Sequence, residues 1–126
     1  MSVVTQVFAL VAALFHVAVF ALESLFFRRP SVRQTFGGRA GVPAEVDLWA
    51  FNQGFYNLFL AAGPVAGVIA YHAGRRAAGE ALTLYACAFM LAAGAVLVLS
   101  QRRLWRGALL QAVPPLIALI AAAVQR

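Results

Sequence analysis

The sequence has very little charge for its length. Only 11% of its 126 residues are charged and 63% are hydrophobic, whereas a soluble domain is typically about 25% charged and about 45–50% apolar. The basic residues are all arginine, and lysine is absent. A chain this apolar is expected to be an integral membrane protein. At about 20 residues per span, its length allows about four membrane-spanning helices.

Other absences exclude several classes of site. The single cysteine, Cys87, lies inside an apolar run, so neither an intrachain disulfide nor a cysteine-based zinc site can form. The sequence contains no glycine-rich phosphate loop, nucleophile elbow or Ser-His-Asp set, and we expect no metal and no cofactor. It therefore carries no recognisable enzyme signature. A cleavable signal peptide is not expected, since Met1–Gln6 has no basic residue.

The apolar runs predict one all-α domain over residues 1–126. Four transmembrane helices are expected at about 3–27, 46–71, 80–99 and 104–124, in an antiparallel up-down bundle. The loop at 28–45 is rich in arginine, glycine and proline, so it cannot be helical throughout and is expected to pack as a cap.

The arginines predict the orientation of the bundle. The loops after the first and third helices hold seven of the ten arginines, so the positive-inside rule puts these loops in the cytoplasm and both termini outside it. This role in topology accounts for the net charge of +6 without a nucleic-acid partner. Four arginines could instead hold an anionic lipid head group: Arg28, Arg29, Arg33 and Arg39.

The second expected helix contains an unusual polar stripe. Its stretch LWAFNQGFYNLFLAAG places Asn52, Gln53, Tyr56 and Asn57 toward one side, with bulky apolar residues on the other. Bonds between helices are one explanation, each contributing about 0.6 kcal/mol in membranes. Four polar groups together are more than such packing usually needs, so we expect them to line a pocket for a ligand or water.

Glu23 in the first helix is the strongest single signal. A carboxylate inside a span is costly unless it is paired or solvated, and such residues are usually functional. Glu23 and His16, two helical turns earlier on the same face, are candidates for acid–base chemistry. Alternatively, Glu23 ties its helix to Asn52 or Gln53, and His16 is simply hydrogen-bonded.

The depths of these residues predict a shared cavity. At about 1.5 Å per residue, Glu23, the Asn52–Gln53 pair and Gln111 all lie about 8–10 Å inside the arginine-rich end. His16 and the pair Tyr56–Asn57 lie deeper. We therefore expect a polar cavity that opens toward the cytoplasm.

The order of the motifs is similar to that of one family. The segments FHVAVFALESLFF, NQGFYNLFLAAG and QAVPPLIALI, with an FGG-containing loop after the first, resemble a bacterial family of small four-helix membrane proteins, domain of unknown function 1304. The resemblance spans most of the chain. It implies an inner-membrane location and a four-helix bundle, and it implies no activity.

Three functions remain open from the sequence. The first is binding, with possible acid–base conversion, of a small apolar or amphipathic molecule that enters from the lipid bilayer. The second is proton-coupled export through Glu23, since small multidrug exporters are similar in size and also have a glutamate in their first helix. The third is a structural scaffold. Phenylalanine-rich faces of the first two helices could also support a homodimer.

Overall fold

The computed structural model describes residues 1–36 and 44–125 of the chain. Every regular element within these residues is helical: α1 Val3–Phe20, the π-helix η1 Ala21–Leu25, α2 Pro30–Thr35, α3 Ala44–His72, α4 Arg76–Ser100, the 3-10 helix η2 Arg102–Leu104 and α5 Trp105–Ala123. Four of these segments are long and apolar enough to cross a membrane. The predicted all-α architecture with four spans is therefore confirmed; the first span combines α1 with η1, and the fourth combines η2 with α5.

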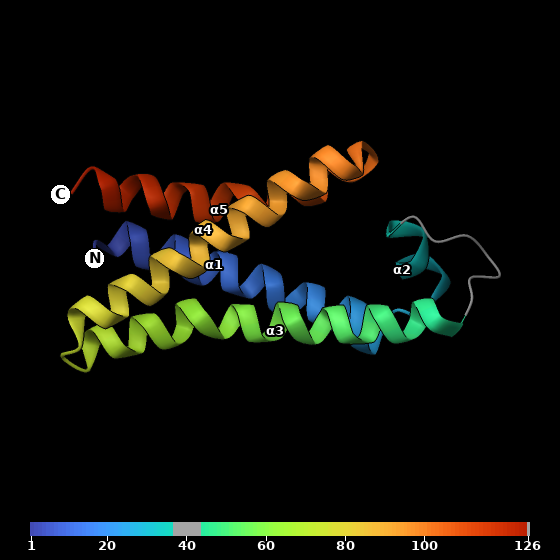
Figure 1. Ribbon diagram of the computed structural model, residues 1–126, viewed down its shortest axis with the longest axis horizontal. Coiled ribbons are helices and arrows are strands. Elements are labelled where there is room, and N and C mark those ends of the chain that lie inside the picture. Colours follow the sequence, from blue (N-terminus) through green and yellow to red (C-terminus); the bar gives the residue numbers. More distant parts are fainter. Residues whose placement is uncertain (37–43, 126) are drawn as a thin grey trace.

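The four long helices form an antiparallel bundle. Each helix packs against the next along the chain, and α5 closes the ring by packing against α1. Both termini lie at one end of the bundle, together with the α3–α4 turn, while α2 lies at the opposite end beside the start of α3 (Figure 1). We call this second end the cap end. The predicted up-down order of the helices is confirmed.

Residue size separates the inside of the bundle from its outside. The buried positions carry mostly small side chains, including Ala9, Ala12, Cys87 and Ala118, whereas large apolar side chains such as Leu99 are exposed. In water this arrangement would leave the apolar surface unprotected. In a bilayer it is the expected one, because small residues allow helices to approach closely and lipid covers the large ones.

The closest approach of α3 and α4 occurs at two glycines. A Cβ atom added to Gly67 would lie 2.2 Å from the Thr83 hydroxyl and 2.8 Å from the carbonyl oxygen of Gly79. A Cβ added to Gly79 would lie 2.5 Å from the Gly67 carbonyl oxygen. From this contact α4 leans away from α3 toward the cap end (Figure 1). The two helices are thus in close contact at the end opposite the cap and lie further apart at the cap end.

Part of the segment after the first span forms the short helix α2. Pro30 occupies the first turn of α2, where its missing N–H leaves no unsatisfied donor. The Phe36 ring, after the end of α2, packs against the Phe27 ring with their centroids 6.1 Å apart. Arg39 lies outside the described residues. The described part of the 28–45 segment therefore covers the end of the bundle.

Both tryptophans lie near the cap end. Trp49 is in the second turn of α3 and Trp105 is the first residue of α5; Trp49 is 74% exposed and Trp105 is 49% exposed. The Arg106 guanidinium lies 5.4 Å from the Trp105 ring centroid. Exposed tryptophans beside arginine at helix ends are typical of the membrane–water interface.

Candidate functional site

Glu23 lies on the only π-helical turn in the described part of the chain, at the end of α1. The Ser24 hydroxyl donates to the Phe51 carbonyl oxygen at 2.8 Å, which fixes η1 against α3. Gly54 makes this contact possible, since a Cβ there would lie 2.1 Å from the Ser24 hydroxyl oxygen. Single π turns occur often at functional sites. This one holds Glu23 at the contact between the first two spans.

The Glu23 carboxyl group has a definite partner on α3. The Asn57 side-chain amide donates to Glu23 Oε2 at 2.9 Å and also to the Gln53 carbonyl oxygen at 3.1 Å. The sequence suggested Asn52 or Gln53 as the partner of Glu23. Asn57 takes this role because it lies on the same side of α3 as the buried residues Gly54 and Ala61.

His16 is almost fully buried, with 1% of its surface exposed. Its Nδ1 atom lies 2.9 Å from the Ala12 carbonyl oxygen. Because a carbonyl oxygen only accepts hydrogen bonds, Nδ1 carries the proton in this contact. The opposite ring nitrogen, Nε2, is buried and has no partner among the described residues. In a neutral ring Nε2 is an acceptor, so His16 holds an unused hydrogen-bond acceptor.

A cavity of about 930 Å³ occupies the bundle where α4 leans away from α3. We call it the bundle cavity. All four spans contribute to its wall, and Thr35 and Phe36 line it from the cap end. The structure brings together in this wall six of the seven residues named as catalytic or ligand-binding candidates from the sequence: His16, Glu23, Gln53, Tyr56, Asn57 and Gln111.

Asn52 is the candidate that the structure leaves out. It is exposed and lines neither the bundle cavity nor the second cavity described below. The buried side of α3 includes Gly54, Asn57, Ala61 and Pro64. Three of the four residues of the polar stripe therefore line the bundle cavity, and Asn52, at the outer edge of the stripe, does not.

Gln111 joins two helices at the far wall of the bundle cavity. Its side-chain amide donates to the Met90 carbonyl oxygen on α4 at 3.4 Å. Helix α5 continues through Pro114 and Pro115, whose rings remove two backbone donors and leave earlier carbonyls without their usual partners. Gln111 thus combines a structural contact with a position in the cavity wall.

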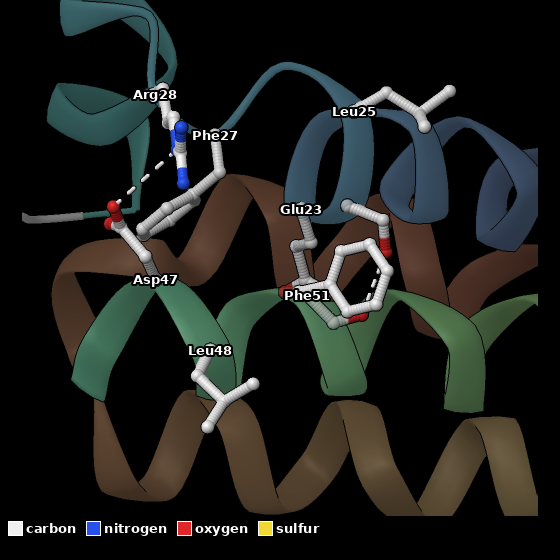
Figure 2. Close-up of a pocket in the computed structure, with 8 residues that line it drawn as sticks. Glu23, Leu25, Phe27, Arg28, Asp47, Leu48 and Phe51 are labelled. Carbon is white, nitrogen blue, oxygen red and sulfur yellow. Dashed lines mark hydrogen bonds and ion pairs between the residues drawn. The ribbon is translucent and has the colours of Figure 1, made fainter. Parts of the chain in front are cut away.

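A second cavity, of about 510 Å³, lies between η1 and the start of α3. We call it the cap cavity; its lining residues are Glu23, Ser24, Leu25, Phe27, Arg28, Asp47, Leu48 and Phe51. In Figure 2, Glu23 extends from η1 toward α3, while Arg28 and Asp47 face each other across the cap side of the cavity. Among residues 1–36 and 44–125, Glu23 alone lines both cavities.

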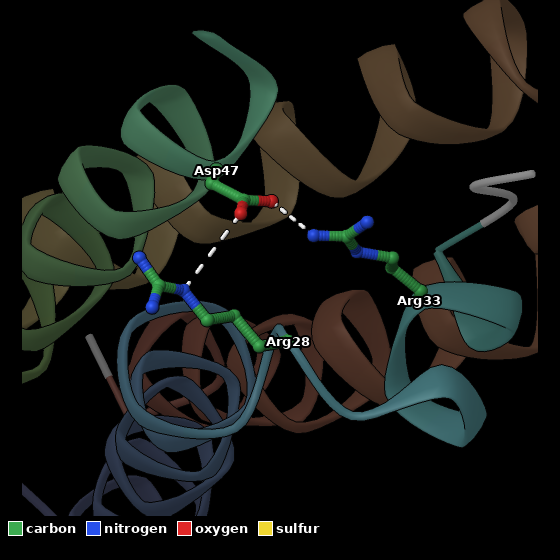
Figure 3. A network of polar contacts seen from close by, with 3 residues as sticks. All are labelled: Arg28, Arg33 and Asp47. Atoms are coloured by element: carbon green, nitrogen blue, oxygen red, sulfur yellow. Dashed lines mark hydrogen bonds and ion pairs between the residues drawn. The ribbon is translucent and has the colours of Figure 1, made fainter. Parts of the chain in front are cut away.

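The cap is fastened to α3 by a small ionic network. Asp47 accepts a hydrogen bond from Arg33 of α2, and its other carboxylate oxygen lies 3.8 Å from Arg28 Nε (Figure 3). Arg33 and Asp47 are each about one quarter exposed or less, whereas Arg28 is largely exposed. Arg29 instead stacks over the Phe26 ring at 4.6 Å. Arg33 is therefore engaged within the protein, which leaves Arg28 and Arg29 more accessible to lipid head groups.

Replacing Asp47 by asparagine is expected to loosen the cap. The variant leaves the half-buried Arg33 without its anionic partner; hydrogen bonds to charged groups contribute about 1.5–3 kcal/mol, and partial exposure reduces this to about 1–2 kcal/mol. Hydrogen–deuterium exchange should become faster in α2 and unchanged in α4. The neighbouring exposed Glu45 supplies the control, Glu45→Gln. Equal exchange in the two variants would show that the network does not hold the cap.

Sequence reasoning missed several of these features. Asp47 was not considered, although it is the chain's one aspartate and stands at the start of a span after an arginine-rich segment. Arg103, Arg106 and Gly107 line the bundle cavity, whereas in the sequence the two arginines indicate only topology and the glycine carries no signal. The π turn has no signal in a single sequence. Within the described residues, no three His, Cys, Asp or Glu side chains gather as a metal ion would require.

Fold and composition define a multi-pass membrane protein built as a four-helix bundle, with a cavity at its cap end. The family model described as "protein of unknown function (DUF1304)" matches residues 10–123. The chain belongs to this family, as its motifs suggested. No curated protein and no solved structure matches the chain.

Proposed function

We propose that the protein lies in the inner membrane and binds a small amphipathic molecule in the bundle cavity. The arginines favour an orientation with the cap in the cytoplasm and both termini outside it. One observation carries the proposal most directly: His16 lines the cavity while its buried Nε2 atom has no partner among the described residues. A buried polar atom left unsatisfied costs about 1–3 kcal/mol. A ligand that donates a hydrogen bond would remove this cost.

The lining residues favour a ligand with distinct polar and apolar parts. The acceptor at His16 suits a hydroxyl or N–H group, and the Glu23 carboxyl group offers a second polar contact. In the same cavity wall, Phe15, Phe59 and Phe89 provide apolar surface. Both Phe59 and Phe89 are more than half exposed. This exposure favours entry of the ligand sideways from the lipid.

The same groups would supply acid–base chemistry if the ligand is converted. A carboxyl group in apolar surroundings can donate a proton, and a neutral imidazole can accept one. Asn57 orients the Glu23 carboxyl group by its 2.9 Å hydrogen bond. Ala12 orients the His16 ring by accepting from Nδ1. Each of the two candidate acid–base side chains thus has a hydrogen-bond partner that fixes its orientation.

Mass spectrometry of lipids and metabolites on gently purified protein tests the proposal. We expect one class of amphipathic compound on the unmodified protein, and at least about tenfold less on Glu23→Gln and His16→Asn, since a lost buried hydrogen bond of about 1.4 kcal/mol corresponds to tenfold in affinity. Asparagine at position 16 still reaches the Ala12 carbonyl but lacks an atom equivalent to Nε2. His16→Gln restores an acceptor near that position and should regain binding.

Asn52→Ala is the matched control, because Asn52 belongs to the same polar stripe and lies outside both cavities. It should retain the compound. The scaffold alternative draws support from the Glu23–Asn57 hydrogen bond, which joins two spans. If all variants carry the same lipids and differ only in thermal stability, the scaffold function replaces ligand binding.

A further inference from the structure

Glu23 occupies a position that ligand binding alone does not explain. It lines the bundle cavity on one side and the cap cavity on the other, and no other residue in the described part of the chain is common to both walls. The hydrogen bond of Ser24 to Phe51 and the close approach at Gly54 press η1 against α3 at this point. Glu23 therefore lies where the two cavities meet.

The two cavities differ in chemistry. The charged groups of the cap cavity other than Glu23 are Arg28 and Asp47, and Arg28 is 89% exposed. Charged and exposed lining groups favour occupation of the cap cavity by water. The bundle cavity is lined mainly by apolar side chains, and its other titratable or charged groups among the described residues are His16, Tyr56, Arg103 and Arg106. The apolar lining of the bundle cavity favours binding of the apolar part of a ligand.

We propose that Glu23 connects an aqueous proton supply in the cap cavity with the ligand in the bundle cavity. A hydronium ion in the cap cavity transfers a proton to the Glu23 carboxylate, which leaves a water molecule and a neutral carboxylic acid. The acid then donates this proton to an accepting group of the ligand and becomes a carboxylate again. Asn57 holds Oε2 during the cycle, so the other carboxyl oxygen carries the proton. The donation step rests on the proposed function, whereas access from the cap cavity does not.

Two carbodiimides of different solubility test this access, because both modify carboxyl groups. A water-soluble cationic carbodiimide should modify Glu23 through the cap cavity, and a lipid-soluble one should modify it through the bundle cavity. Peptide mass spectrometry measures the modified fraction. Glu45, exposed at the start of α3, serves as the internal standard for the aqueous reagent.

Substitutions that narrow each cavity separate the two routes. Leu48→Trp narrows the cap cavity, which Leu48 lines, and should lower aqueous modification of Glu23 at least about fivefold while the lipid-soluble reagent still reacts. Gly107→Phe narrows the bundle cavity. It should lower modification of Glu23 by the lipid-soluble reagent while the water-soluble reagent still reacts. Val46→Trp is the control for Leu48→Trp, because Val46 is on the same helix and lines neither cavity.

The proposal is overturned if the aqueous reagent modifies Glu45 but not Glu23 in the unmodified protein. It is also overturned if Leu48→Trp lowers aqueous modification no more than Val46→Trp does. Neither result bears on whether a ligand co-purifies with the protein. Conversely, a protein without a ligand can still show modification of Glu23 from both sides. The two proposals therefore fail separately.

Discussion

Gly79→Val is expected to destabilise the bundle by about 3 kcal/mol or more, at the upper end of the usual cost of overpacking. A Cβ atom at this position would lie 2.5 Å from the Gly67 carbonyl oxygen and 2.5 Å from the Tyr71 backbone nitrogen. Both neighbours are backbone atoms of α3, so no side chain can rotate away. The helices would have to separate, and contacts on both sides of this point would be lost.

Thermal unfolding in mild detergent, followed by helical circular dichroism, measures this effect. Ala78→Val is the control, since it places the same side chain at the preceding, exposed position of α4. Gly63→Ala provides a graded variant: its Cβ would lie 3.0 Å from the Ala86 Cβ, so a small shift accommodates it and the loss should be smaller. If Gly79→Val melts at the same temperature as Ala78→Val, the glycine contact does not hold α3 and α4 together.

Gly107→Phe is expected to abolish ligand binding without destabilising the protein. Gly107 lines the bundle cavity, and a Cβ added there would have no atom of another described segment within 4 Å. A larger side chain can therefore occupy the cavity without a clash. Replacing glycine inside a helix also removes a cost of about 0.5–1 kcal/mol relative to alanine. The melting temperature should be unchanged or slightly higher.

Ligand retention is the measurement for this variant. The compound that co-purifies with the unmodified protein should fall at least about tenfold, because the phenylalanine ring and the ligand compete for one space and 1.4 kcal/mol already corresponds to tenfold. Leu109→Phe is the control, since Leu109 is exposed on the same helix and lines neither cavity. Full retention in Gly107→Phe would place the ligand outside the bundle cavity.

The four spans could be predicted from the sequence because they depend only on where the long apolar runs lie in it. Long apolar runs broken by arginine, glycine and proline leave few alternatives in a chain of 126 residues. The gathering of Glu23, His16 and Gln111 around one cavity also followed from their depths along the helices. Depth is set by the helical rise, which does not require knowledge of how the helices pack.

Rotation about the helix axes was much harder to predict. The polar stripe of α3 was expected to face inward, yet Asn52 is exposed and Asn57 binds Glu23. Gly54 explains this orientation, since its missing side chain admits η1. The π turn likewise arises from packing between helices, because its cost is offset only when a neighbour holds it. A single sequence does not reveal such pairings.

The positions of the two tryptophans have a practical consequence for spectroscopy. Trp105 stands between Leu104 and Arg106, which line the bundle cavity, and Trp49 follows Leu48, which lines the cap cavity. The chain contains no other tryptophan, so its tryptophan fluorescence comes entirely from the cap end. Replacing either indole by phenylalanine leaves one emitter beside one cavity. The protein thus carries one native fluorescent reporter beside the bundle cavity and one beside the cap cavity, and neither requires an attached dye.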